Sequence, residues 1–524
     1  MRRNGMSVMI LVWIVLIPST ALPYTPFWDF RQWDTPEKPI YREYMTRFAR
    51  HGITALVLMS RDSLPPFQRE RAFLADAEKY GVNVWLRTNR VTPKRGIPGQ
   101  PNGTLDFALD KDLQARTLKY LDQLASLSLK YQNLKGLIIG GEELVGAHIT
   151  KKELCRWNEV FYRENGFQAT GKLTQAQKIQ YFDWIQQKNN LWYARIWDYL
   201  HAKYPSLDLF IYPHSEAFGE GKLSKHPRPA YWDIFDLIVI KKKKFKIIAE
   251  SYNISNPLGA WKTAAESAYI RDAVQGHVPF HIIVQGHKTQ GQLHEPGRFQ
   301  IESHIFAALV NGASGIGFWA SDMDSKKDIY DTDRKRWEML FCLIERGRQY
   351  AGYRKIEPDV YVLRPRYTGY VADAPTESSL DIFARLSMRG FFPGFILDEQ
   401  ARMKMLPGSS KVVYIPASRG PERPDALLHL AESGMQIYQN GTLEHFVDVY
   451  HAFRSPFFPS VSSGANNSIH VLLGPEAVLL YNPEHKSTVL SMLFMGKYLN
   501  IFLSPESLIL IDAHSMEKYL SSRG

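Results

Sequence analysis

The chain has 524 residues, of which 45% are hydrophobic and 22% are charged, as in ordinary globular proteins. These proportions exclude a largely disordered chain, a collagen and a polytopic membrane protein. The formal net charge of +11 fits nucleic acid, an anionic polysaccharide or simply a basic surface. The only cysteines, Cys155 and Cys342, are too few for a disulfide scaffold or a cysteine-based zinc site.

The N-terminal segment predicts export. Arg2 and Arg3 precede an apolar run at residues 8–17, and small residues end at Ala21. The run is short for a membrane span, so residues 1–21 are predicted to be a cleaved signal peptide, with an uncleaved anchor as the alternative. Cleavage removes two arginines, lowering the charge from +11 to +9. The mature protein is then secreted, periplasmic or extracellular, with no membrane span, and nucleic acid is not an expected partner.

Short apolar runs alternate with amphipathic stretches through residues 22–352. The runs are rich in β-branched and aromatic residues, as in strands that are buried on both faces. Gly52 follows one amphipathic stretch as an expected helix C-terminal cap. Eight strands separated by helices predict a (β/α)8 TIM barrel, with an open doubly wound sheet as the alternative. The expected strands are residues 25–30, 53–59, 82–88, 134–140, 207–213, 235–240, 280–285 and 315–320.

Two smaller units are expected after the barrel. Residues 353–439 alternate strands and helices, which predicts a small flavodoxin-like α/β domain. Residues 440–467 are rich in Pro, Ser and Phe and are expected to be an irregular connector. Residues 468–524 contain only short strand patterns, which predict a small C-terminal all-β domain. Within the barrel, the aromatic-rich stretch at residues 154–204 is expected to add walls beside the barrel mouth.

The carboxyl ends of the predicted barrel strands carry polar and aromatic side chains, and active sites of TIM barrels lie at these ends. Planar aromatic rings can stack on sugar rings, and carboxyl groups can transfer protons to a glycosidic oxygen. We therefore predict a carbohydrate site there. The candidate substrate-binding residues are Trp28, Asp29, Arg87, Tyr212, His214, Lys241, Gln285, His287, Trp319 and Asp322.

Glu142 and Glu143 are the candidate catalytic residues. They follow an apolar run and two glycines, and a carboxyl group held against apolar walls has the raised pKa of a general acid. The alternative is a carboxylate pair at a helix N-terminus. His214 and His287 can equally be structural histidines, Arg87 a rim ion pair, and Lys241 part of a solvated lysine run. No HExxH or GxSxG motif occurs, and no metal or cofactor is expected.

These features resemble glycoside hydrolase family 42, the β-galactosidase type of retaining TIM-barrel glycosidase. The segment GLIIGGEE resembles the end of the family's fourth strand, and EPGRFQIESHIFAALVNGASGIGFW resembles the region before its eighth strand. The resemblance implies a barrel, a flavodoxin-like domain that contributes to a homotrimer, and a small β domain. It also implies that Glu142 is the general acid/base.

The chain departs from the family at the end of the seventh strand. The family places its nucleophilic Glu there, whereas this chain has Val284 and Gln285. Gly141 stands where the family has Asn. Another acid such as Glu216 or Glu295 could reach the site, or His287 could act with water in an inverting mechanism. Two functions are compatible with this pattern: a secreted glycoside hydrolase acting on an oligo- or polysaccharide, of which an anionic one is an option, or a degenerate barrel that binds carbohydrate or assists polysaccharide assembly.

Overall fold

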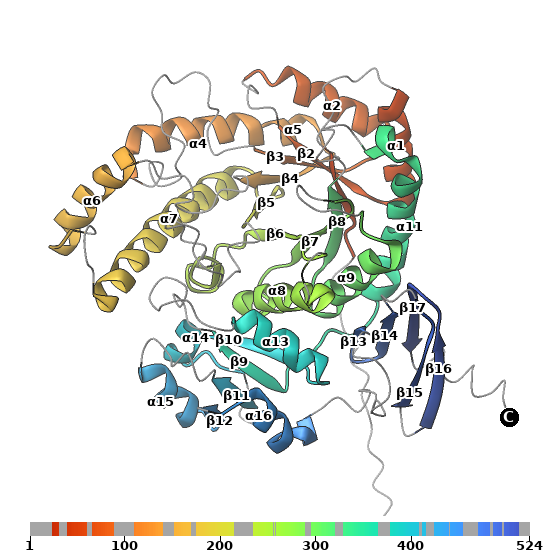
Figure 1. Ribbon diagram of the computed structural model, residues 1–524. Helices are drawn as coiled ribbons and strands as arrows, with labels where there is room; N and C mark the ends of the chain where they lie inside the picture. Colours follow the sequence, from red (N-terminus) through yellow and green to blue (C-terminus); the bar gives the residue numbers. More distant parts are fainter. Residues whose placement is uncertain are drawn as a thin grey trace, which may run out of the picture.

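A computed structural model of the chain contains a barrel and two smaller units beside it (Figure 1). No helix in the described part of the chain is both long and apolar enough to cross a membrane. The structure describes residues 24–30, 39–59, 65–88, 109–139, 151–168, 174–213, 234–254, 256, 258–288, 295–319, 329–364, 378–407, 411–415, 424–439, 441–453, 470–482, 486–494 and 497–512.

Eight parallel strands close into a barrel in sequence order, which confirms the predicted TIM-barrel fold class. The closing pair joins the first strand to the eighth, with Phe27 opposite Gly317. The strands are β1 (Phe27–Phe30), β2 (Thr54–Leu58), β3 (Val84–Arg87), β4 (Leu134–Ile139), β5 (Asp208–Ile211), β6 (Lys246–Ser251), β7 (Phe280–Val284) and β8 (Gly315–Trp319).

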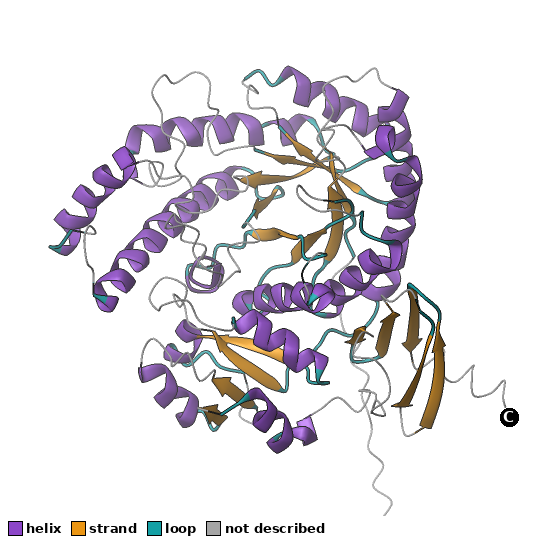
Figure 2. Ribbon diagram, in the orientation of Figure 1, coloured by secondary structure: helices purple, strands orange, loops and turns teal. Residues whose placement is uncertain are grey.

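Helices surround the barrel strands, as Figure 2 shows. Asp110 begins one of them by accepting hydrogen bonds from two backbone N–H groups, and Thr174 begins another with a capping box to Gln177. Gly52 has a φ of 61°, as expected for the predicted cap. The helices are α1 (Pro39–His51), α2 (Gln68–Lys79), α4 (Lys111–Ala125), α5 (Leu127–Lys130), α6 (Lys151–Asn165), α7 (Gln175–Lys203), α8 (Gly259–Val274), α9 (Arg298–Val310), α10 (Ile329–Thr332) and α11 (Arg334–Ala351).

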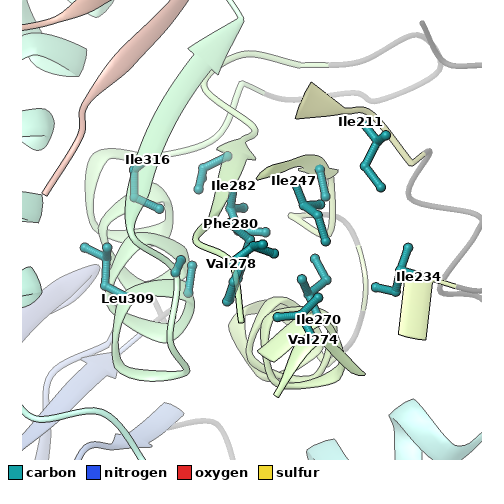
Figure 3. Close-up of a cluster of buried hydrophobic side chains, with 14 of the residues drawn as sticks. Ile211, Ile234, Ile247, Ile270, Val274, Val278, Phe280, Ile282, Leu309 and Ile316 are labelled. Carbon is teal, nitrogen blue, oxygen red and sulfur yellow. The ribbon is translucent and has the colours of Figure 1, made fainter. Parts of the chain in front are cut away.

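The barrel strands bury both faces, because alternate side chains point into the barrel and toward the helices. On β5 to β8 the outward set includes Ile211, Ile247 and Ile282, which lie among side chains of the surrounding helices (Figure 3). The inward set forms a separate cluster. Its members are Phe27, Leu56, Trp85, Ile138, Phe210, Tyr212, Ile248, Ile283 and Trp319. The apolar runs on these strands are therefore explained by burial on two sides.

The sixth strand differs from the prediction. Residues 235–240 were expected to form it, but Asp236–Ile240 is a π-helix, η2, and β6 is Lys246–Ser251. Leu237, Ile238 and Val239 are all buried, and a short run that is apolar throughout reads alike as a buried strand or a buried helical turn. The true strand begins with Lys246, whose ammonium group pairs with Asp208 at 2.5 Å. This charge obscured the strand pattern.

The aromatic-rich stretch between β4 and β5 forms α6 and α7, which extend away from the barrel (Figure 1). Phe161, Tyr181 and Trp184 pack on one another there. Trp184 also donates a hydrogen bond to Glu164 at 2.6 Å. These aromatic residues therefore form the core of the helix pair.

The second unit is a four-stranded parallel sheet in the order β10-β9-β11-β12, flanked by helices. It packs on the barrel through α8, where Asp272 accepts a hydrogen bond from the backbone N–H of Phe395 at 2.7 Å. Its elements are β9 (Val360–Arg364), α13 (Ser379–Met388), β10 (Pro393–Leu397), α14 (Asp398–Arg402), β11 (Val412–Ile415), α15 (Pro424–Glu432), β12 (Gln436–Gln439), α16 (Leu443–Val449) and the 3-10 turn η3 (His451–Phe453).

Part of the segment expected to be an irregular connector is thus helical. Thr442 accepts a hydrogen bond from the backbone N–H of His445 and so begins α16. Phe446 is fully buried against Tyr414 and Tyr438. The single apolar face of this short helix was hidden in the sequence among Pro, Ser and Phe.

The third unit is all-β, as predicted. It consists of an antiparallel sheet in the order β13-β14-β17 and a β15-β16 hairpin. Trp261 of α8 donates a hydrogen bond to the backbone oxygen of Val471 at 3.3 Å, which attaches this unit to the barrel. Its strands are β13 (His470–Leu473), β14 (Ala477–Asn482), β15 (Thr488–Phe494), β16 (Lys497–Leu503) and β17 (Ser507–Asp512).

Candidate active site

An ionic layer lies inside the barrel at the carboxyl ends of its strands. Asp29, Arg87, Tyr212 and Glu250 each follow, two residues along, a member of the inward apolar cluster, so strand alternation directs them inward as well. All four side chains are buried, and Glu250 is the most exposed at 4%. We call these four residues the ionic layer.

The contacts within the ionic layer cross the barrel. Arg87 of β3 donates a hydrogen bond to Asp29 of β1 over 3.4 Å. The guanidinium carbon of Arg87 also lies 3.6 Å from the centre of the Tyr212 ring, next to the end of β5. Tyr212 in turn donates a short hydrogen bond to a carboxylate oxygen of Glu250 on β6. The layer therefore connects strands that are not all neighbours.

The electrostatics of the layer favour a neutral phenol at Tyr212, between the Arg87 guanidinium and the Glu250 carboxylate. Burial raises the pKa of Tyr212 well above its usual value, the Arg87 charge opposes this rise, and the Glu250 charge adds to it. The Tyr212 hydroxyl thus stays protonated and donates to Glu250. The layer thus contains two carboxyl groups, Asp29 and Glu250, and one guanidinium group, that of Arg87. Carboxylate groups stabilise a cation that forms beside them.

An aromatic wall stands beside the ionic layer. The ring of Trp319, at the end of β8, lies parallel to the Tyr252 ring, with 6.3 Å between centres and 16° between planes. The His287 ring meets Trp319 edge-on at 5.0 Å. The Gln285 side chain is fully buried and donates a hydrogen bond to the backbone oxygen of His287 at 2.9 Å. Aromatic faces next to acids suit a sugar ring.

Several predicted residues lie outside the described part of the chain. These are the catalytic candidates Glu142 and Glu143 together with His214, Glu216 and Asp322. Each follows a strand whose last residues are described. Glu142 comes three residues after Ile139 of β4, and β4 lies between β3 and β5, which carry or precede Arg87 and Tyr212. Their roles remain predictions.

Two predicted site residues lie elsewhere. Trp28 follows Phe27 and precedes Asp29 on one strand, so it must face the opposite side from both. It stacks on Phe341 of α11 with 4.7 Å between ring centres, in the layer between barrel and helices. Lys241 precedes β6 and pairs with Asp236 at 3.3 Å. It therefore lies at the amino end of that strand, and neither residue is retained in the candidate site.

Glu295, an alternative second acid, is held in the loop before α9. Its carboxylate accepts a hydrogen bond from the backbone N–H of Lys288 at 2.8 Å and lies 3.5 Å from Arg336. Through these contacts Glu295 stabilises the loop in which it lies. Among the residues that the structure describes, no group of three or more His, Cys, Asp or Glu side chains is arranged to hold a metal ion.

The sequence reading missed Glu250 and Tyr252, because it placed the sixth strand one segment too early. The signal was present: the run KIIAESY contains a buried apolar core, and its Glu and Tyr stand at the strand end. Had the strand been assigned to these residues, the alternation of side chains along it would have predicted that Glu250 faces inward like Ile248.

The closed barrel, its two smaller units and the acidic and aromatic strand ends define a TIM-barrel protein with a glycosidase-like fold. More narrowly, the fold is that of the glycoside hydrolase family 42 β-galactosidases, which confirms the resemblance drawn from the sequence. No protein-family model matches the chain, and no curated protein matches it.

Three solved structures illustrate this likeness. A β-galactosidase from Rahnella sp. R3 is 11% identical, with a TM-score of 0.67 over 94% of this chain and 98% of that one. A β-galactosidase from Halorubrum lacusprofundi is 10% identical, with a TM-score of 0.67 over 93% of this chain and 99% of that one. An exo-carrageenase of family 42 from Bacteroides ovatus is 11% identical, with a TM-score of 0.62 over 93% and 82%. At such identities the likeness concerns the fold.

Proposed function

We propose that the protein is a glycoside hydrolase that cleaves O-glycosidic bonds of an oligo- or polysaccharide at the carboxyl end of its barrel. Glu142 serves as the general acid, protonating the leaving oxygen and later activating water. The observation that carries the proposal is the ionic layer, because it provides buried carboxyl groups at the carboxyl end of the barrel, and Glu142 comes three residues after β4 in the sequence. Cleavage of a glycoside by a protein generally needs two such groups.

The charge of the ionic layer bears on the substrate. Arg87 is already matched by Asp29, and Lys241 precedes β6, near the amino end of that strand. The basic residues that suggested an anionic sugar therefore do not supply a free cation to this layer. We expect an uncharged sugar ring next to the acids, stacked on the wall of Trp319 and Tyr252.

The N-terminal segment completes the proposal. Cleavage after residue 21 would deliver the barrel to the periplasm or the exterior, where polysaccharides are met. The N-terminal sequence of protein recovered from the host tests this, and a chain that starts at Met1 would contradict it.

Activity is best tested with purified full-length protein on a panel of aryl glycosides and neutral and acidic polysaccharides. Glu142→Gln should slow hydrolysis about 10²- to 10⁴-fold for poor leaving groups, because these require protonation. Dinitrophenyl glycosides release dinitrophenolate, a leaving group that needs no proton. The variant should therefore break their glycosidic bond at nearly the wild-type rate. Glu143→Gln is the neighbouring control for the assignment within the pair.

A carbohydrate-binding protein on a degenerate barrel is the second candidate. Gln285 favours it, because it stands where the resemblance places the nucleophilic Glu and donates instead to the backbone of His287. Under this alternative no glycoside is cleaved, yet calorimetry detects oligosaccharide binding that Trp319→Ala abolishes. If the wild-type protein releases sugar and Glu142→Gln does not, the carbohydrate-binding alternative is excluded.

A further inference from the structure

We propose that Glu250, on the sixth strand, is the nucleophile of the reaction, with Tyr212 as its positioning residue. This inference rests on the proposed function and names the second carboxyl group that it requires. The seventh strand cannot supply it, because Val284 is apolar and Gln285 carries an uncharged amide that cannot form a stable glycosyl ester.

Position supports Glu250 over the other acids. It lies on the inner face near the carboxyl end of β6, paired in register with Ile283 of β7, so it stands beside the strand that lacks the acid. Asp29 is engaged by the Arg87 guanidinium on the other side of the layer. Glu295 is held by the backbone of Lys288 and by Arg336.

The surroundings of Glu250 fix its orientation. One carboxylate oxygen accepts the Tyr212 hydroxyl proton in a short hydrogen bond. The Tyr212 ring is itself held by the Arg87 guanidinium 3.6 Å from its centre, and Arg87 is held by Asp29. A nucleophile gains from such fixed placement, because little motion then separates the bound state from the reacting geometry. A hydrogen bond donated to the carboxylate also favours its ionised form.

The chemistry balances with the groups named. A Glu250 oxygen bonds to the anomeric carbon while the bond from that carbon to the glycosidic oxygen breaks, and the leaving oxygen takes the proton of Glu142. Water then gives a proton to Glu142 and its oxygen bonds to the anomeric carbon, which releases Glu250 as carboxylate. The Glu250 carboxylate lies next to the positive charge that develops on the sugar while its bond to the anomeric carbon forms in the first step and breaks in the second.

The first test replaces the nucleophile in the full-length protein. On the best aryl glycoside of the panel, Glu250→Gln should lower kcat at least about 10³-fold. Sodium azide added to Glu250→Ala should restore turnover and yield a glycosyl azide whose anomeric configuration is opposite to that of the wild-type sugar product. Glu266→Gln is the matched control, because Glu266 is a buried glutamate of α8 outside the barrel interior, and it should keep the wild-type rate within about threefold.

The second test examines Tyr212 and does not depend on a stable Glu250 variant. Tyr212→Phe removes the hydrogen bond that favours ionised Glu250, so the acidic limb of the kcat/KM profile should move upward by about one pH unit. A purely structural tyrosine would lower activity without moving this limb.

The outcomes separate the two proposals. Wild-type protein that cleaves no glycoside removes the hydrolase function and with it this inference. Active wild-type protein whose Glu250→Gln variant stays within tenfold of it overturns the role of Glu250 alone. The same follows if the product anomer is inverted, if no glycosyl azide forms, or if the Tyr212→Phe profile keeps the wild-type acidic limb.

Discussion

Along β1, β3 and β5 the barrel interior changes character within two residues. Near the amino ends Phe27, Trp85, Phe210 and His281 pack ring against ring, with Trp85 and His281 stacked at 5.2 Å. Near the carboxyl ends the ionic layer takes their place. We call the first set the aromatic layer. The comparison indicates that one strand can stabilise the fold at one end and present reactive groups at the other, since side chains on the same face recur every second residue.

Trp85→Ala should give the largest effect on the aromatic layer. Trp85 is 4% exposed and contacts Phe27, Phe210 and His281, so truncation leaves a large cavity. We expect the free energy of unfolding to fall by about 4 kcal/mol, measured by urea denaturation. Leu129→Ala, at a side chain that is 70% exposed, should change it by less than about 0.5 kcal/mol. A small effect of Trp85→Ala would show that the aromatic layer is not a stabilising core.

Arg87→Met should be the most destabilising change in the ionic layer. It leaves the buried Asp29 carboxylate without the guanidinium, which we expect to cost about 3 kcal/mol of unfolding free energy. The double variant Asp29→Asn/Arg87→Met should recover part of this loss, because no charge is then stranded. Equal losses in the single and double variants would contradict the ion-pair interpretation.

Gly317→Ala tests how tightly the aromatic layer is packed. A Cβ atom at this position would overlap the Phe27 ring, and such overpacking should cost about 2 kcal/mol. Gly297→Ala is the matched control, since no heavy atom lies within 4 Å of its added Cβ. Thermal unfolding of both variants gives the comparison, and equal melting temperatures would indicate that the ring can move aside.

His281 gives the aromatic layer a pH dependence of its own. Burial, with a smaller contribution from the Lys246 charge, lowers its pKa from 6.5 to about 3. Below pH 6.5 the unfolded chain therefore binds more protons than the folded one. The contribution of neutral His281 to the free energy of unfolding is thus present above that pH and is lost as pH falls. We expect a loss of about 1 kcal/mol between pH 6.5 and 5.5. His281→Gln should abolish it in urea titrations, whereas His277→Gln, at an exposed position, should not.

The sequence predicted seven of the eight barrel strands nearly in place, because their buried runs end at clear polar residues. It could not distinguish the buried helical turn at Asp236–Ile240 from a strand, so Glu250 was missed. Of two adjacent candidates, it retained both Trp28 and Asp29, although alternation allows only one to face inward. The pairing of Tyr212 with Glu250 depends on barrel closure, which brings strand ends together that no local pattern relates.

Helix α8 has a consequence for any attempt to shorten the protein. Its Trp261 and Tyr269 side chains are buried, the first against the C-terminal β unit and the second against Arg364 and Phe395 of the α/β unit. A fragment that ends at Ala351 would expose these rings to solvent as part of an aggregation-prone apolar surface. We therefore expect the truncated barrel to aggregate on expression. In the full chain the two smaller units bury this surface of α8.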